Sequence, residues 1–203
     1  MNPQKTALIL VGFQNDYFAK DGILRGVVEE PNRVDEVLAN SLAFIRTALD
    51  AGVTVISTPI TLTPDYRALA NAVGILDTIK ESGAFKEGST GADTVPELAA
   101  LGDRIMLVMG KVEFNAFSNT DLDRVLRSRG ITHVLVAGLV TSLCIDSTGR
   151  AAYERGYAVT MLSDCCSART SAEHDFYCRT IFPLYCDVAT GAQVAEAFAA
   201  VTA

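Results

Sequence analysis

Short apolar runs alternate along the chain with longer segments that have helical periodicity. The runs of strand length are rich in Val, Ile and Leu, and we expect β-strands over residues 7–11, 53–58, 105–109, 133–137 and 158–162. Because these runs are almost continuously apolar, they are typical of strands that are buried on both faces of a parallel sheet. The pattern therefore predicts an α/β fold, a three-layer α/β/α sandwich with a mostly parallel, Rossmann-like sheet.

The intervening segments carry the periodicity or the punctuation of helices. We expect helices over residues 32–51, from Asn119 or Thr120 to Arg129, from Thr141 to Arg155, over 188–201, and a short one beginning near Pro96. Gly52, Gly130 and Gly156 stand where a helix-ending glycine is favoured, and the side chains of Asn119, Thr120 and Thr141 are capping types. The region 60–97 has the least regular pattern. A chain of 203 residues suits one core, so we expect a single domain over residues 1–203.

Charge and cysteine content restrict the class of partner. The formal net charge of −7 and the absence of any basic run argue against nucleic acid, because a phosphate-binding surface needs clustered Lys and Arg. The apolar runs are too short to span a membrane, and the N-terminal segment shows no export pattern. The five cysteines have no zinc-ligand spacing, and adjacent Cys165 and Cys166 are poor disulfide partners. We therefore expect a reduced, cytoplasmic protein whose partner is a small molecule.

Cys144 occupies the position with the most chemical promise. It follows the apolar run 134–138 and falls in the first turn of the helix expected from Thr141. Ligands of α/β folds bind at the carboxyl ends of the strands, and the amides at a helix start favour a thiolate over a thiol. Free cysteines are more often small buried hydrophobes, the role we assign to Cys165, Cys166, Cys178 and Cys186. Cys144 is therefore the candidate nucleophile.

Lys111 follows the apolar run 104–109 at the equivalent end of another strand. A lone lysine there would ordinarily be solvated. Beside Cys144, however, an ammonium would stabilise the thiolate, and a desolvated lysine can exchange protons near neutral pH. We expect the two side chains to meet only if their parallel strands are neighbours.

The chain resembles the isochorismatase-like cysteine hydrolases, which include nicotinamidases and related amidases. The resemblance is carried by the segments 7–18, 85–98, 111–122 and 136–152, followed by 158–164. The spacing Gly138-x-x-Thr141-x-x-Cys144 and the stretch from Lys111 to Ala116-Phe117 are specific in combination.

This resemblance implies roles for individual residues. Cys144 would be the nucleophile and Lys111 its basic partner, after a cis peptide bond between Leu139 and Val140. The backbone amides of Val140 and Cys144 would form the oxyanion hole. The substrate-binding residues would be Phe13, Gln14, Phe117, Val140 and Thr141. Homo-oligomerisation is also expected by analogy.

Position 12 departs from the family pattern. The family has an aspartate two residues before the Gln of the Gln14-Asn15-Asp16 block, where it acts as general base, and this chain has Gly12. A glycine can neither accept a proton nor hold the lysine, and a general base is typically worth about 10²–10⁴-fold in rate. Asp16 matches the family's own block and is expected to be structural. Glu113 is the other carboxylate near Lys111, and we expect it to be an exposed surface residue.

No metal or other cofactor is expected. Nicotinamidases of this family bind a metal through an aspartate and two histidines after the second strand, and the matching residues 58–66 contain no histidine. His133 and His174 are the only histidines, and neither position suggests a site. Nicotinamide is therefore disfavoured as a substrate. Isochorismate is disfavoured too, because that reaction depends on the aspartate.

The leading hypothesis is a cysteine-dependent hydrolase of a small amide- or ureide-like C–N bond, acting through a thioester. The alternative is a catalytically impaired relative that binds a small metabolite in the same pocket, a hypothesis motivated by Gly12. A third possibility is that glycine replaced aspartate so that a complex or acyl-enzyme is trapped.

Overall fold

The central sheet contains six strands, all parallel, in the order β3-β2-β1-β4-β5-β6. The computed structural model describes the backbone of residues 1–202, and the side chains of all of these except Pro31, Val201 and Thr202. The strands are β1 (Thr6–Val11), β2 (Thr54–Thr58), β3 (Met106–Leu107), β4 (His133–Leu139), β5 (Ala158–Ser167) and β6 (Asp187–Ala189). The predicted parallel α/β fold is thereby confirmed.

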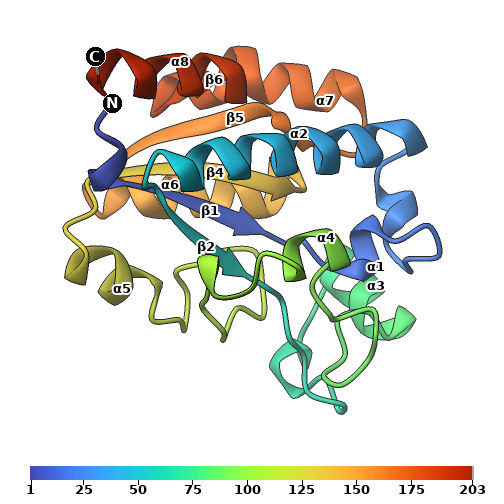
Figure 1. The fold of residues 1–203 in the computed structure, drawn as a ribbon. Coiled ribbons are helices and arrows are strands. Elements are labelled where there is room, and N and C mark those ends of the chain that lie inside the picture. Colours follow the sequence, from blue (N-terminus) through green and yellow to red (C-terminus); the bar gives the residue numbers. More distant parts are fainter. Residues whose placement is uncertain (203) are drawn as a thin grey trace.

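Helices cover both faces of this sheet (Figure 1). They are α1 (Asn15–Phe18), α2 (Pro31–Asp50), α3 (Ile75–Ser82), α4 (Pro96–Ala99), α5 (Leu122–Ser128), α6 (Asp146–Glu154), α7 (Ser171–Phe176) and α8 (Gly191–Thr202). Short 3₁₀ turns occupy Pro3–Lys5, Arg25–Val27, Arg67–Leu69, Gly102–Arg104 and Phe182–Leu184, and π turns occupy Thr141–Ile145 and Tyr177–Ile181.

The side-chain alternation of β1 divides the core into two clusters. Leu8 and Leu10 point to the face that α2 and α8 cover, while Ile9 and Val11 point to the face that α5 and α6 cover. All six residues of β1 are buried, which agrees with its unbroken apolar sequence. The three-layer arrangement therefore follows from burying both faces of the central strands.

Several element boundaries differ from the sequence prediction. β3 has two residues in place of the run 105–109, whereas β4 and β5 extend beyond 137 and 162. The terminal helix begins at Gly191 rather than at 188, because Val188 and its neighbours pair with β5 as the edge strand β6. Such pairing depends on distant residues, so the local pattern could not show it.

The predicted helix starts were right only in part. α5 begins at Leu122, and the Thr120 hydroxyl accepts a hydrogen bond from the Leu122 amide at 3.3 Å. Thr141 does not cap a helix, since the segment that follows it is a π turn before α6 begins at Asp146. The helix starts expected at Pro96 and near residue 32 are confirmed by α4 and α2.

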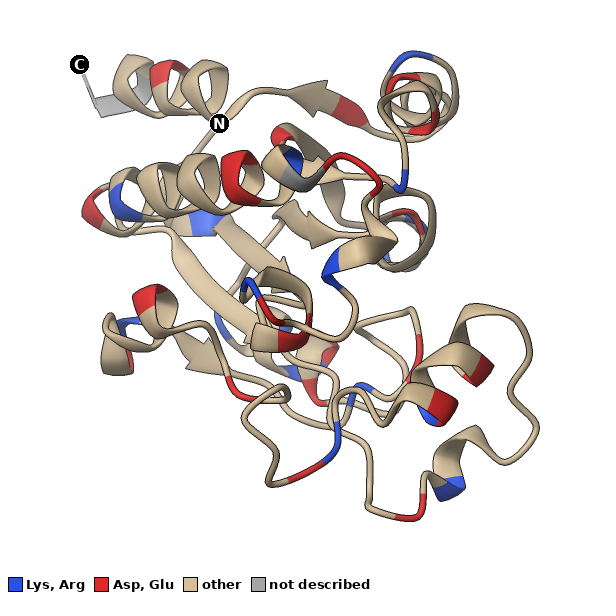
Figure 2. Ribbon diagram, turned by 90° about the vertical axis from the view of Figure 1, so that its right-hand side faces the viewer, with Lys and Arg blue, Asp and Glu red and all other residues tan. Residues whose placement is uncertain are grey.

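Acidic and basic residues are interspersed over the helices and loops (Figure 2). Many are joined one helical turn apart, as in Arg127–Asp123 and Arg150–Asp146, each with a nitrogen–oxygen distance of 2.9 Å. Within residues 1–202, none of the helices combines the length and the apolar character that crossing a membrane requires.

Candidate active site

The candidate site lies where β1 and β4 end side by side. These strands are neighbours at the centre of the sheet, and Val11 is paired with Gly138. Chain connections run outward from β1 on one side and from β4 on the other, so this is the switch point at which α/β sheets bind ligands. Gly138 permits the close approach, because a Cβ atom there would lie 1.9 Å from the Val11 carbonyl oxygen.

A distinctive turn follows β4 and carries Cys144. The peptide bond between Leu139 and Val140 is cis, as the resemblance implied. The π turn Thr141–Ile145 comes next, and the amides of Leu143 and Ile145 both donate to the Val140 carbonyl. Cys144 lies within this turn and is only 4% exposed. A π turn between a strand and a helix is a frequent feature of functional sites.

Lys111 reaches Cys144 from a distant strand. Its Nζ atom lies 3.7 Å from Cys144 Sγ and also donates a hydrogen bond to the Glu113 carbonyl. The expectation that their strands must be neighbours was wrong, because β2 and β1 separate β3 from β4. After β3 the chain crosses the end of β2, where Lys111 bridges to Ile60, and so reaches the centre of the sheet.

Burial sets the protonation behaviour of Lys111. The side chain has no exposed area, and desolvation lowers the pKa of its amine from the ordinary value of 10.5. The nearby charges of Cys144 and Glu113 oppose this shift but do not cancel it. The amine is therefore a better proton acceptor near neutral pH than a solvated lysine.

The other cysteines are in environments that favour the thiol. Burial raises the pKa of Cys165 and of Cys186 to about 12, and that of Cys178 to about 11. Burial also raises the pKa of Cys166, well above its ordinary value. None of these four lies against a lysine, so the structure singles out Cys144 among the five cysteines, all of them free.

Gly12 directly follows β1 and borders the cis-peptide turn. Its φ angle is +75°, which disfavours any side chain there. A Cβ atom on this backbone would lie 3.2 Å from Cε2 of Tyr17 and 3.4 Å from the Leu139 carbonyl oxygen. The space in which a residue at position 12 would extend is therefore already occupied by the Tyr17 ring.

Gln14 and Asp16 hold the loops around the site. Gln14 is fully buried, donates to the carbonyls of Ile60 and Ala92 at 2.7 and 2.8 Å, and accepts from the Ile60 amide. Both of its amide hydrogens are thus engaged, and binding a substrate through them would require breaking these bonds. Asp16 accepts a hydrogen bond from the Phe85 amide at 2.6 Å, in agreement with the structural role expected for it.

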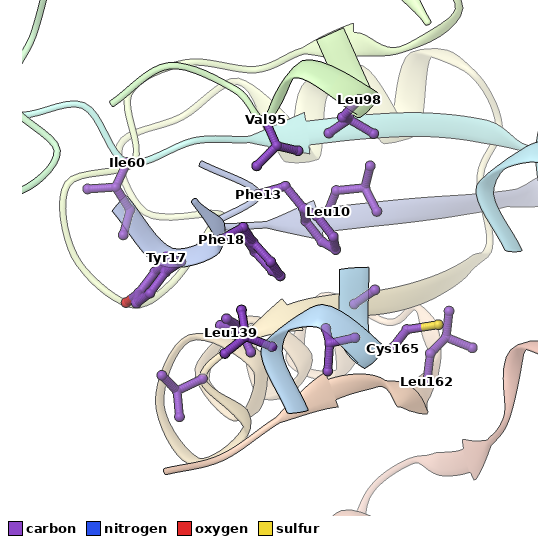
Figure 3. Close-up of a cluster of buried hydrophobic side chains, with 14 of the residues drawn as sticks. Leu10, Phe13, Tyr17, Phe18, Ile60, Val95, Leu98, Leu139, Leu162 and Cys165 are labelled. Atoms are coloured by element: carbon purple, nitrogen blue, oxygen red, sulfur yellow. The ribbon is translucent and has the colours of Figure 1, made fainter. Parts of the chain in front are cut away.

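The aromatic residues expected around the pocket lie on different faces of the sheet. Phe13 is 1% exposed and stacks on Phe18 with a ring distance of 5.0 Å, in the cluster beneath α2 (Figure 3). Phe117 belongs to the other cluster, together with Cys144, and stacks against Tyr157 at 6.3 Å. The packing of Phe13 against Phe18 gives it a role in the core, while Phe117 shares the core environment of the candidate nucleophile.

His174 contacts the site, which the sequence did not indicate. Its Nδ1 atom lies 2.9 Å from the Thr141 hydroxyl, and both residues are buried. Its Nε2 atom lies 3.5 Å from the Cys178 sulfur. The hydroxyl of Thr141 is therefore engaged with α7 and holds the Cys144 turn against that helix. Nothing in the local sequence of residues 171–176 indicates this contact, because Thr141 is 33 positions away.

We expected no catalytic role for Glu113 or for His133. The side chain of Glu113 is exposed, as expected, and its backbone carbonyl accepts the hydrogen bond from Lys111. The His133 ring bonds to the Thr160 hydroxyl at 2.8 Å. Among the residues that the structure describes, no three His, Cys, Asp or Glu side chains gather as metal ligands would.

A cleft of about 590 Å³ opens at α1, and Asp16 is one of its lining residues. Asn15, Lys20, Asp21, Thr90 and Glu97 are among its lining residues, and Cys144 and Lys111 are not. This cleft is therefore separate from the cysteine–lysine pair.

The fold and the site together define a doubly wound α/β protein with a buried cysteine–lysine pair at the switch point of its sheet. The chain belongs to the isochorismatase family, since residues 6–193 match the isochorismatase domain. It is 28% identical over 183 residues to the uncharacterized isochorismatase family protein YwoC of Bacillus subtilis, with 89% of this chain and 87% of that protein covered.

Two further relatives extend the comparison. The ureidoacrylate amidohydrolase RutB of Pantoea ananatis is 31% identical over 175 residues, which cover 80% of this chain and 69% of that protein. The crystal structure of a putative isochorismatase from Burkholderia xenovorans superposes with a TM-score of 0.77 at 28% identity, covering 98% of this chain and 89% of that one. Of these three proteins, RutB is an amidohydrolase by name.

Proposed function

We propose that the protein is a cysteine hydrolase that cleaves a small amide- or ureide-like C–N bond. The observation that carries the proposal is the contact of 3.7 Å between Lys111 Nζ and Cys144 Sγ. The contact is buried at the switch point of the sheet and follows the cis-peptide turn. A thiol held against a desolvated amine is the arrangement that a nucleophilic cysteine needs.

The first chemical step uses the lowered basicity of Lys111. The neutral amine accepts the proton of the Cys144 thiol, which leaves an ammonium beside a thiolate. The thiolate attacks the substrate carbonyl carbon, a C–S bond forms, and the carbonyl π electrons move to oxygen. The backbone amides of Val140 and Cys144 are the proposed donors to that oxyanion.

The second half returns the proton. The Lys111 ammonium gives its proton to the nitrogen of the breaking C–N bond. The amine or ammonia departs, and the acyl group remains on Cys144 as a thioester. Water then adds to the thioester, with Lys111 accepting its proton, and the acid is released as the thiol of Cys144 re-forms. In this chain Lys111 alone therefore carries the proton, whereas the family pattern has an aspartate in addition to the lysine.

The class of substrate is inferred from relatives and from the side chains around Cys144. RutB is an amidohydrolase of a ureide. Phe117 and Val140 are apolar and nearly sealed from solvent, at 5% and 1% exposure. We infer an uncharged amide or ureide group as the reacting part, with these two side chains beside it.

Release of ammonia from a panel of primary amides and N-carbamoyl compounds tests the proposal. Turnover by the wild type that is lost in Cys144→Ala supports it. Cys186→Ala is the matched control, because Cys186 directly precedes β6 and so lies at the opposite end of the parallel sheet from Cys144. The alternative function, binding of a metabolite without hydrolysis, predicts saturable binding by calorimetry and equal, negligible turnover in the wild type and in Cys144→Ala.

We further propose that copies of the chain associate and that the protein works in a reducing compartment such as the cytoplasm. Tyr153, Phe176 and Leu184 are exposed by 55%, 53% and 78%, and we propose that these side chains take part in the contact. All five cysteines are free. Light scattering coupled to size exclusion would give the mass, and a monomer at micromolar concentration would contradict association.

A further inference from the structure

The Tyr17 ring occupies the space that the glycine at position 12 leaves open. A Cβ atom on Gly12 would lie 3.2 Å from Cε2 and 3.3 Å from Cδ2 of this ring. A side chain at position 12 would require this ring to shift by a few tenths of an ångström and would be strained at a φ of +75°. Gly12 and Tyr17 therefore form a complementary pair at the end of β1.

The orientation of this ring is fixed by its surroundings. Tyr17 belongs to α1, is 4% exposed, and packs against Phe85 with a ring distance of 5.1 Å and an interplanar angle of 58°. The residue before it, Asp16, is held by the Phe85 amide, and Gln14 is held by Ile60. These two anchors before Tyr17 and the packing against Phe85 leave the ring little freedom to turn.

The hydroxyl of Tyr17 has no hydrogen-bond partner among the described residues. A buried phenol ordinarily finds a partner. Within the described part of the chain, Ser41 Oγ is the one unpartnered side-chain polar atom that is sealed from solvent. The Tyr17 oxygen must therefore reach solvent, and Figure 3 shows it turned away from the other labelled side chains.

The Tyr17 ring also borders the turn that leads to Cys144, because the same Cβ position on Gly12 lies 3.4 Å from the carbonyl oxygen of Leu139, the residue before the cis peptide bond. Burial raises the pKa of Tyr17 well above 10.0, and the negative charge of a Cys144 thiolate, together with that of Asp16, raises it further. The phenol is therefore uncharged at neutral pH and offers an O–H donor. It makes no hydrogen bond to Cys144 in the free protein, so this donor is available to a bound molecule.

We propose that Tyr17, whose ring occupies the space beside Gly12, is a substrate-binding residue whose hydroxyl donates a hydrogen bond to the molecule held at Cys144. This inference rests on the proposed function and narrows it. The substrate carries a hydrogen-bond acceptor beside its scissile bond, and that acceptor can be negatively charged. A neutral phenol accepts such a group, whereas a carboxylate at position 12 would repel it.

Alkylation of Cys144 by two reagents tests the inference. Iodoacetamide carries an amide oxygen that can accept a hydrogen bond, and iodomethane carries none. In Tyr17→Phe we expect the rate of Cys144 alkylation by iodoacetamide to fall about 3- to 10-fold, the range for a lost neutral hydrogen bond, while the rate with iodomethane stays within about twofold of the wild type. Quantitative mass spectrometry of the Cys144 peptide gives both rates.

Tyr66→Phe is the matched control. Its phenol is also buried, in the same core cluster, but it donates to the Ala84 carbonyl at 3.0 Å. This variant loses a buried hydroxyl without touching the site, and both alkylation rates at Cys144 should match the wild type.

Two outcomes would overturn the inference. Equal slowing of both reagents in Tyr17→Phe would show that the phenol acts on the thiolate rather than on the bound molecule. Unchanged rates with both reagents would show that it acts on neither. The proposed function is tested separately, by ammonia release in the wild type and in Cys144→Ala, so its failure would not be mistaken for a failure of Tyr17.

Discussion

The amine of Lys111 and the sulfur of Cys144 lie 3.7 Å apart although 33 positions separate them in the chain. Lys111 follows an edge strand and Cys144 follows a central one, and the pair forms because residues 108–111 run across the end of β2. Both side chains are buried, so their interaction is only weakly screened by solvent. This contact makes Cys144 chemically different from the other cysteines.

Selective alkylation should reveal that difference. At pH 7 we expect iodoacetamide to label Cys144 faster than Cys178 and Cys186, although these two thiols are more exposed. Their raised pKa values, about 11 and about 12, leave almost no thiolate at this pH. Peptide mass spectrometry over a time course gives the three rates, and equal labelling would refute an activated Cys144.

Removing the amine of Lys111 should separate activity from stability. Lys111→Met keeps much of the side-chain volume but loses the proton acceptor, and turnover should fall by about 10²-fold or more. Unfolding should occur at the same temperature or higher, because a desolvated amine no longer has to be buried. Exposed Lys5→Met is the control. Undiminished turnover in Lys111→Met would rule out the proposed proton carrier.

The pH dependence of turnover should follow the lysine. Burial lowers the pKa of Lys111 from 10.5, and the neutral amine is the form that accepts the thiol proton. Turnover should therefore rise with pH through a pKa below 10.5, and this rise should be absent from any residual activity of Lys111→Met. A wild-type profile that is flat from pH 6 to 10 would contradict the assignment.

Introducing aspartate at position 12 should not restore a conventional triad. Gly12→Asp forces a side chain into a backbone with φ of +75° and against the Tyr17 ring. We expect a loss of about 1–3 kcal/mol in the free energy of unfolding and no gain in turnover. Gly26→Ala is a suitable control, since nothing lies within 4 Å of a Cβ atom there. A gain of several orders of magnitude would show that the glycine disables an otherwise intact site.

The contact between His174 and Thr141 should be measurable as a coupling. Thr141→Val and His174→Phe each remove one partner of a buried hydrogen bond of 2.9 Å. A double-mutant cycle on the free energy of unfolding should give a coupling of about 1 kcal/mol. Additive effects would mean that the contact does not stabilise the turn that carries Cys144.

Acid should weaken the fold partly through His174. Burial, and then the charge of Arg33, lower the pKa of this histidine below 6.5, although Asp175 opposes the shift. The unfolded chain therefore binds a proton at this histidine more readily than the folded chain does. The contribution of neutral His174 to the free energy of unfolding is complete above pH 6.5 and is lost as the pH falls below that value. Urea unfolding at pH 7.5 and pH 5 should show a smaller difference in His174→Gln than in the wild type. His133, whose pKa is also lowered by burial, is present in both proteins and contributes to the difference in stability that remains in His174→Gln.

The central strands and the position of Cys144 at the end of the sheet could be predicted because their signals are local. An unbroken apolar run such as 134–137 must be buried on both sides, and the polar turn after it must lie at the end of the sheet. The resemblance added the cis peptide bond at Leu139–Val140, which the structure contains. The edge strand β6 escaped prediction, because its three residues are extended only through pairing with β5.

The sequence by itself therefore determined the parallel α/β sheet, the position of Cys144 at the end of β4, and the absence of a carboxylate at position 12. Tertiary structure alone decided which groups surround that cysteine. Lys111 reaches it across β2, His174 holds its turn through Thr141, and the Tyr17 ring fills the space beside Gly12. The physical reason is that hydrophobic patterning specifies which face of each element is buried, whereas contacts among loops at the end of a sheet depend on strand order and on the packing of distant residues.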